Sequence, residues 1–252
     1  MFIPQLFVFG LGALGFGGFI FFKGFGWMKQ KRLIENTPTS KVRSIAMGQV
    51  EVFGEAIANE NRLIKSPLSN SDCVYYKYSV MEHRGSGKNS RWVVVKKGEE
   101  RAHFYLKDET GLVLVDPADA EIDIPADFQF DSSWGKDPPE TVKNFLRANN
   151  LSFEGWLGIN KRMHYTEFFI APGDRLYIMG SAGDNPFVEE GAGEKNEADI
   201  MLQKGAGAYL ISDKSEKEVL QKFFLKTVGG LLGGTALIII GLLIVFANIG
   251  IL

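Results

Sequence analysis

The chain has 252 residues, and its 28 Lys and Arg against 30 Asp and Glu give no support to nucleic acid as a partner. One cysteine excludes an internal disulfide framework and a zinc site built from several thiolates. Because only three histidines accompany it, we expect no metal site and no bound cofactor.

The charged residues are confined to the middle of the chain. The first is Lys23 and the last is Lys226, so 22 uncharged residues lie before them and 26 after them. Residues 2–22 and 227–252 are apolar stretches that, at ~1.5 Å per helical residue, can cross a hydrocarbon core of ~30 Å. The sequence therefore predicts one transmembrane helix over residues 1–23 and another over residues 227–252, with the lipid bilayer as a partner.

The first span is predicted to be an anchor that is not cleaved. A secretory signal carries Lys or Arg before a shorter apolar stretch and has a small-residue cleavage site after it. Here no charge precedes the stretch, and basic residues follow it from Lys23 onward. We expect a juxtamembrane segment over residues 24–47 to connect the anchor to the rest of the chain.

The entry into the second span carries a helix start signal. Ser215 and Glu218 have the spacing of a capping box, in which a hydroxyl and a carboxylate satisfy each other's backbone amides. This spacing predicts a helical connector over residues 213–226 that continues without a break into the second span.

Basic residues on the domain side of both spans indicate an orientation, since neither outer tail carries one. Lys and Arg near the ends of spanning helices are retained on the cytoplasmic side, so we expect a cytoplasmic domain with both termini outside. A free Cys73 agrees with a reducing compartment. The flanking basic residues are Lys23, Lys29, Lys31, Arg32, Lys41 and Arg43 after the first span and Lys214, Lys217, Lys222 and Lys226 before the second.

Between the spans, residues 48–212 have the patterns of a β-rich domain. Residues 74–81 alternate with the period of two that is typical of a half-buried strand, and a Gly-rich turn and a run from Trp92 to Val95 follow, which predicts a hairpin. So many short runs separated by Gly, Pro and Asp predict a small barrel or sandwich. The further strand candidates are residues 49–58, 102–106, 112–115, 120–124, 164–170, 175–179 and 208–211.

One or two short helices are expected beside these strands. Residues 138–149 begin with two prolines and an acid, which favour a helix start. Thr39 or Ser40 is expected to cap a second helix that ends at Ala46, and residues 183–198 are expected to form an acidic, mobile loop. The predicted fold class is two transmembrane helices that flank a mainly-β (α+β) soluble domain.

Several short motifs resemble one known family. The run of residues 37–52, TPTSKVRSIAMGQVEV, follows a spanning helix and resembles the GIDE family, the membrane-anchored relatives of a mitochondrial E3 ubiquitin ligase. The similarity covers about residues 35–182 and the second span. The other matching pieces, in the family's order, are Pro67-Leu68, Cys73 to Tyr76, Leu114 to Pro117, Tyr165 to Glu167 and Pro172 to Asp174.

The resemblance departs from the family's ligase at one point. That ligase carries a RING after its second span, and a RING needs eight Cys or His ligands. Cys73 and the three histidines fall short of that number, so the resemblance implies the membrane-side module without the ligase module. We therefore expect an interaction or scaffold module at the membrane, with ubiquitin-protein transfer and organelle organisation inherited from the family as the alternative and an uncharacterised hydrolase as a third.

The other reactive side chains are expected to have structural or solvent-exposed roles rather than catalytic ones. Cys73 begins an alternating strand and is expected to be a buried structural thiol, and His83, His103 and His164 are expected to be satisfied or exposed. The acids are expected to form a solvated face rather than a cation site, because their spacing does not match a calcium loop. These acids are Asp116, Asp119, Glu121, Asp123, Asp127 and Asp131.

Binding candidates come from the motifs of the resemblance. Lys41 and Arg43 lie near the membrane in the best-matched motif, and two interpretations stay open: contact with lipid headgroups, or contact with the sheet or a neighbouring subunit. Tyr165 and Glu167 are candidates for the same surface. The protein partner itself is not predicted.

Glycines in the second span are candidates for helix packing. Gly229 and Gly233 are four residues apart, as are Gly230 and Gly234, and Ala13 and Gly17 have this spacing in the first span. Small residues at this spacing let helix backbones approach closely in lipid. We expect packing through these glycines, either on the first span or on a second copy in a homo-oligomer, against the alternative that glycine is simply frequent in membrane helices.

Overall fold

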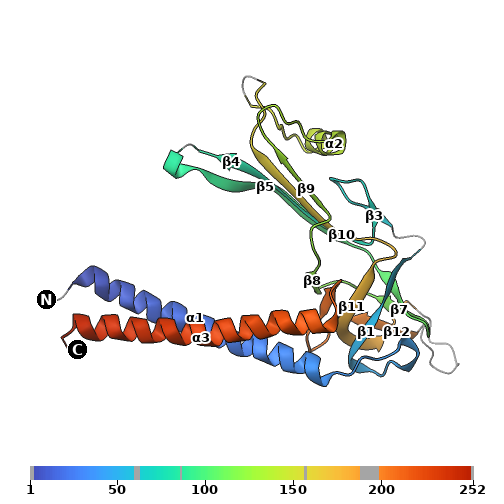
Figure 1. The fold of residues 1–252 in the computed structure, drawn as a ribbon. Helices are drawn as coiled ribbons and strands as arrows, with labels where there is room; N and C mark the ends of the chain where they lie inside the picture. Colours follow the sequence, from blue (N-terminus) through green and yellow to red (C-terminus); the bar gives the residue numbers. More distant parts are fainter. Residues whose placement is uncertain (1–2, 60–62, 86, 156–157, 188–198, 251–252) are drawn as a thin grey trace. The chain divides into compact units, whose positions relative to one another are not determined.

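The structure is a computed structural model that describes residues 3–59, 63–85, 87–155, 158–187 and 199–250. It divides into two compact units, one made of Met1–Pro38 and Lys214–Leu252 and the other of Thr39–Asp213. Figure 1 shows the elements of both units, and each unit is described by itself below.

The first unit contains two helices of 33 residues, α1 (Pro4–Asn36) and α3 (Glu216–Asn248). Both are long and apolar enough to cross a membrane. The capping box of α3 is confirmed, since Ser215 Oγ accepts from the Glu218 amide and the Glu218 carboxylate accepts from the Ser215 amide at 2.9 Å. Helix α1 extends past the predicted span because no breaker occurs before Pro38, which disfavours helical backbone at Thr37.

The two helices run antiparallel to each other, so the chain termini lie at the same end of this unit (Figure 1). At that end the Ile3 amide donates to Asn248 Oδ1 at 2.9 Å, and Asn248 Nδ2 donates to the Ile3 carbonyl at 2.8 Å. These bonds satisfy backbone groups of Ile3 just before α1 begins, where the first turn of a helix leaves them without helical partners.

The second unit contains a closed barrel of five strands. Its strands are β1 (Gly48–Ala58), β6 (Phe104–Lys107), β7 (Leu112–Val115), β12 (Ile200–Gln203) and β11 (Arg175–Asp184). Each pairs with the next and β11 pairs back with β1, while the β12–β7 pairing is parallel. β13 (Leu210–Ser212) and β8 (Glu121–Asp123) continue from β11 as an extension. Closure removes free sheet edges, and the predicted barrel is confirmed.

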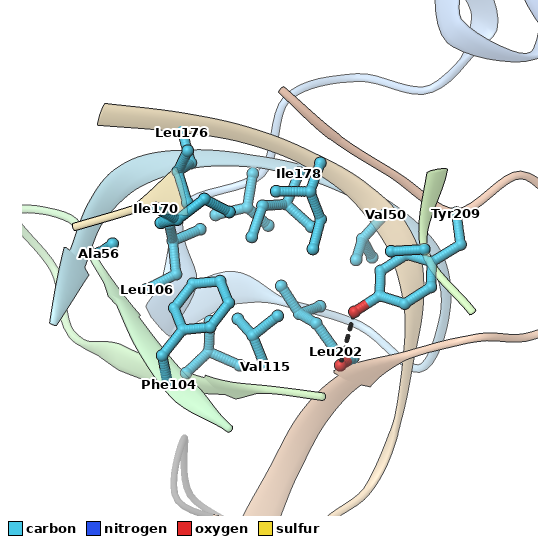
Figure 2. Close-up of a cluster of buried hydrophobic side chains, with 14 of the residues drawn as sticks. Val50, Ala56, Phe104, Leu106, Val115, Ile170, Leu176, Ile178, Leu202 and Tyr209 are labelled. Atoms are coloured by element: carbon cyan, nitrogen blue, oxygen red, sulfur yellow. Dashed lines mark hydrogen bonds between the residues drawn. The ribbon is translucent and has the colours of Figure 1, made fainter. Parts of the chain in front are cut away.

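The barrel interior is filled by alternate side chains of its strands (Figure 2). On β1 the residues Val50, Val52 and Ala56 are buried, and the period of two places them on one face. Phe104 and Leu106 of β6 fill the same core in Figure 2. Side chains of alternate strand positions fill the interior of small barrels in this way.

A separate antiparallel sheet holds four strands in the order β5-β4-β10-β9. They are β4 (Tyr75–Arg84), β5 (Arg91–Arg101), β9 (Phe128–Ser132) and β10 (Met163–Ile170). Helix α2 (Glu140–Ala148) contributes Val142 and Leu146 to the core on one face of this sheet. The short ladder of β2 (Ile64–Lys65) with β3 (Asp72–Cys73) precedes β4.

Several predicted elements are confirmed and some are corrected. The 84–90 hairpin and the helix after Pro138-Pro139 are present as β4–β5 and α2. The helix expected from Thr39 or Ser40 is wrong: only a single 3-10 turn, Val42–Ser44, forms, and Lys41 at its start makes no side-chain cap. β9 and β12 were not predicted. The acidic loop expected at 183–198 lies mostly outside the described residues, and its first two residues end β11.

Candidate interaction surface

One face of the four-stranded sheet buries Tyr75 and Ile170 at the end where they join the barrel core, and we call the rest of this face the open face. The opposite face holds the buried Tyr78, Val80 and Tyr165 under α2. Every side chain on the open face is exposed or half-buried, and Trp92 and Val94 are 43% and 48% exposed. The open face consists of Lys77, Ser79, Met81 and His83 of β4, Trp92, Val94, Lys97 and Glu99 of β5, Gln129 and Asp131 of β9, and His164, Thr166 and Phe168 of β10.

Ring contacts order the open face near the turn between β4 and β5. The Trp92 ring meets His83 edge-on at 5.1 Å between centroids and His164 at 6.2 Å. His164 Nδ1 lies 2.6 Å from Asp131 Oδ1, and its Nε2 lies 2.9 Å from the Thr166 hydroxyl. Both ring nitrogens of His164 therefore have partners, so the imidazole has a fixed orientation. Its edge contact and that of His83 hold the Trp92 ring in place, and we call these three rings the aromatic platform.

A cleft of about 510 Å³ adjoins this face at Val94. Glu82 lies inside it between two cations, with Arg84 Nη2 at 2.8 Å and Lys161 Nζ at 3.8 Å. The rest of its lining mixes Val94 and Met163 with polar groups. Glu82 offsets one of the two cations, so the charged side chains of the cleft lining sum to +1.

Lys41 and Arg43 lie on the barrel side of this unit. Lys41 Nζ forms an ion pair with Glu109, and the Arg43 amide donates to Thr110 Oγ1 at 3.1 Å. Burial raises the pKa of Asp108, but hydrogen bonds from Thr110, Val42 and Gly111 outweigh that effect and lower it. The Val42–Ser44 turn is therefore joined to the loop between β6 and β7. Contact of Lys41 and Arg43 with lipid headgroups or a neighbouring subunit stays a prediction.

Tyr165 and Glu167 lie on the four-stranded sheet and not beside Lys41. Both are fully buried. Glu167 accepts from the Leu68 amide at 2.8 Å, from the Ser69 amide at 2.9 Å and from Ser69 Oγ at 2.6 Å. Burial raises the pKa of Tyr165. These contacts give Glu167 a positioning role for the turn after Pro67, and the structure does not bring the four binding candidates together.

A second buried carboxylate explains the motif at residues 37–52. Glu51 is fully buried, although it lies on the outer side of the barrel strand. It accepts from Thr39 Oγ1 at 2.8 Å and from the Tyr177 hydroxyl at 2.8 Å. The Ser40 amide donates to the Glu51 carbonyl at 2.7 Å. The motif's polar residues thus fasten the start of the domain to β1.

The remaining reactive side chains considered above are Cys73 and His103. Burial raises the pKa of Cys73 to about 12, so the thiol stays protonated at neutral pH. Among the described residues, no group of three His, Cys, Asp or Glu side chains is placed to hold a metal ion. His103 lies 3.6 Å from Asp116 and stacks edge-on against Phe187.

The glycines of the second span fall on two sides of α3. A Cβ at Gly230 would lie 2.9 Å from Trp27, and one at Gly234 would lie 2.7 Å from the Phe21 amide, so both glycines face α1. Gly229 and Gly233 would meet nothing within 4 Å. The search for four-residue spacings missed a second signal in α1. Its buried glycines, Gly10, Gly17 and Gly24, recur every seven residues.

Comparison with known proteins gives one match. The family model described as "GIDE: E3 Ubiquitin ligase" matches residues 75–246, which is more than half of the chain. The match includes the four-stranded sheet, most of the barrel and most of α3. Neither the curated proteins nor the solved structures contain a match.

Proposed function

Because the chain belongs to the GIDE family, we propose that it is a two-span membrane protein whose β-rich domain is an interaction and scaffold module at the bilayer. The observation that supports this proposal is the open face. It combines an ordered aromatic platform with aliphatic and polar side chains, and not one of them is buried.

The composition of this face fits a protein contact. Interface cores are enriched in Trp, Phe and Met and are surrounded by polar residues, and a few aromatic anchors carry most of the binding energy. Trp92, Met81 and Phe168 supply such anchors, and Lys77 and Gln129 lie at the rim. The fixed His164 reduces the side-chain entropy that a partner must remove.

The proposal is tested by substituting the platform. Trp92→Ser with Val94→Ser is expected to reduce the recovery of a specific partner at least tenfold when the full-length, detergent-solubilised protein is captured by affinity. Phe53→Ser is the matched control, since Phe53 is 44% exposed on barrel strand β1. Unchanged recovery with the double variant, or an equal loss with the control, would reject the open face as the binding surface.

We further propose that the domain faces the cytoplasm. Lys and Arg lie on the domain side of both spans, which is the side that is retained during insertion. In a Cys73→Ser background, Asn89→Cys is expected to resist a membrane-impermeant thiol reagent in intact cells and to react after lysis. Asn89 is exposed in the β4–β5 turn, so burial does not protect it. Labelling of intact cells would reverse the orientation.

The alternative function, participation in ubiquitin transfer, is favoured by the description of the matching family. The 252 residues contain one Cys and three His, half of the ligands that a RING requires. We expect the purified chain to carry no stoichiometric zinc and to leave the discharge rate of a loaded ubiquitin-conjugating enzyme unchanged. Two zinc ions per chain by elemental analysis, or faster discharge, would establish the alternative.

A further inference from the structure

Strand β5 is an edge strand of eleven residues. It lies at one end of the order β5-β4-β10-β9, and β4 is its hydrogen-bonded neighbour in the described part of the chain. The amides and carbonyls on its other side therefore form a row that another strand can extend. Natural proteins usually protect a sheet edge by keeping the edge strand short, by bending it with a bulge or by placing charged side chains, especially lysine, along it.

The charges on β5 are antisymmetric about a central glycine. The sequence from 96 to 100 is Lys-Lys-Gly-Glu-Glu. If an antiparallel copy pairs with β5 so that Gly98 faces Gly98, then Lys97 faces Glu99 of the copy and Lys96 faces Glu100. All four opposed pairs of this register join opposite charges, and opposite charges in directly opposed positions stabilise antiparallel strands.

Neighbouring registers lack this match. A copy centred on Lys96 places that lysine opposite itself, and one centred on Lys97 does the same with the next lysine. Like charges in directly opposed positions destabilise a strand pair. The charge pattern therefore selects one register instead of preventing pairing altogether.

The charged groups are available for such contacts. Within the described residues Lys96 and Lys97 form no ion pair, while Glu99 accepts from Arg101 Nε at 2.8 Å and Glu100 accepts from the Tyr76 hydroxyl at 2.7 Å. Arg101 Nη2 also contacts Glu99. A carboxylate has two oxygens and about four lone-pair positions, so each glutamate retains acceptor capacity.

The β5 edge is regularly paired with β4 and supported by it around Gly98. β5 pairs with β4 in regular register from Lys96 to Arg101, because the irregularity between Val80 and Met81 lies before that stretch. A Cβ at Gly98 would lie 2.6 Å from the Tyr78 ring, so the ring of the neighbouring strand covers the glycine. This support holds the backbone extended although glycine alone weakens a strand.

From these observations we infer that two copies of the chain join through antiparallel pairing of their β5 edges, with the two-fold axis at Gly98. The interface is isologous, as in most homodimers. It fuses the two four-stranded sheets and keeps Lys97 and Glu99 on the open-face side and Lys96 and Glu100 on the α2 side. Trp92 and Val94 lie outside the paired stretch, so this inference goes beyond the proposed function and does not depend on it.

Charge exchange tests the inference in the full-length chain. One variant carries Lys96→Glu and Lys97→Glu, the other carries Glu99→Lys and Glu100→Lys, and each is made with two different affinity tags and reconstituted in the same bilayer. Tagged wild-type copies are expected to capture each other, and each variant is expected to capture itself at least tenfold less. Mixing the two variants restores all four opposed pairs and is expected to restore capture.

Two results of the capture experiment overturn the inference. If the wild-type copies fail to capture each other, the edge is unpaired. If both variants capture themselves like the wild type, the copies meet elsewhere, for example through Gly229 and Gly233 of α3.

Disulfide formation in a Cys73→Ser background tests the register. Lys97→Cys mixed with Glu99→Cys is expected to form a disulfide more efficiently than either variant alone, and equal yields exclude the Gly98 axis. Melting temperatures of the variants close to the wild-type value establish that they are folded.

Discussion

Replacing Glu167 by Ala is expected to lower the stability of the domain by about 3–5 kcal/mol, because three donors lose a buried charged acceptor together. The amides of Leu68 and Ser69 cannot rearrange toward water without opening the turn that carries the buried Leu68. Glu167→Gln is expected to cost less, about 2 kcal/mol, since the amide keeps one acceptor oxygen but turns a donor toward Ser69.

Thermal unfolding of the solubilised protein measures this loss. At roughly 2–4 °C per kcal/mol for a domain of this size, Glu167→Ala is expected to lower the melting temperature by about 6–20 °C. Lys77→Ala is the matched control, because it removes an exposed charged side chain from the same sheet and is expected to change the melting temperature by no more than about 2 °C. Equal shifts for both variants would show that Glu167 does not hold the turn.

Leucine at the inward glycines is expected to separate the two spans. A Cβ at Gly17 would lie 2.9 Å from Leu237 Cβ and 3.0 Å from the Gly234 carbonyl, and one at Gly234 would lie 2.8 Å from Phe21 Cα. Backbone cannot yield as a flexible side chain does, so each substitution is expected to cost roughly 1–3 kcal/mol or more. Gly229→Leu and Gly233→Leu are matched controls on the same helix, because both positions face open space.

The contact between the helix ends reports this separation. In a Cys73→Ser background, Ile3→Cys with Asn248→Cys is expected to form an intrachain disulfide, since the Ile3 backbone and the Asn248 side chain are hydrogen-bonded to each other. Gly17→Leu with Gly234→Leu is expected to reduce the yield severalfold, and the control pair to leave it unchanged. If the control pair reduces the yield equally, the helices pack through a different face. Packing of Gly229 and Gly233 on a second copy stays a prediction.

Much of the architecture follows from periodic patterns in the sequence. The uncharged ends, the capping box at Ser215 and the alternation along β1 and β4 each depend on local residues, and the two apolar helices and the barrel are confirmed. Family membership is confirmed as well, on motifs that are individually short. Local chemistry was sufficient for these elements.

Elements that depend on distant partners were not predictable in this way. β12 has four residues and is completed by parallel pairing with β7, which lies far away in the sequence. Thr39 is a good cap residue, but its hydroxyl binds Glu51 instead, so the expected helix is reduced to one turn. Tertiary hydrogen bonds outweighed the local preference at this position.

The candidate surface shows the same limit. Tyr165 and Glu167 are polar residues in a family-like motif and therefore resembled a binding pair. Their register on β10 turns both away from the open face, Tyr165 into the cluster with α2 and Glu167 toward the turn after Pro67. Thr166, between them in the sequence, faces the open side. Only the pairing of three strands shows that Trp92, His83 and His164 share one face, and no single segment contains that information.

The central claim is that the open face is where this membrane-anchored module meets its partner, and site-specific photo-crosslinking in native membranes tests it most directly. A benzophenone amino acid in place of Trp92 is expected to give a discrete crosslinked product, and the same group in place of the similarly exposed Phe53 is expected to give none. The mass of the product distinguishes a second copy of the chain from another protein. No product at position 92, or an equal product at position 53, would contradict the claim.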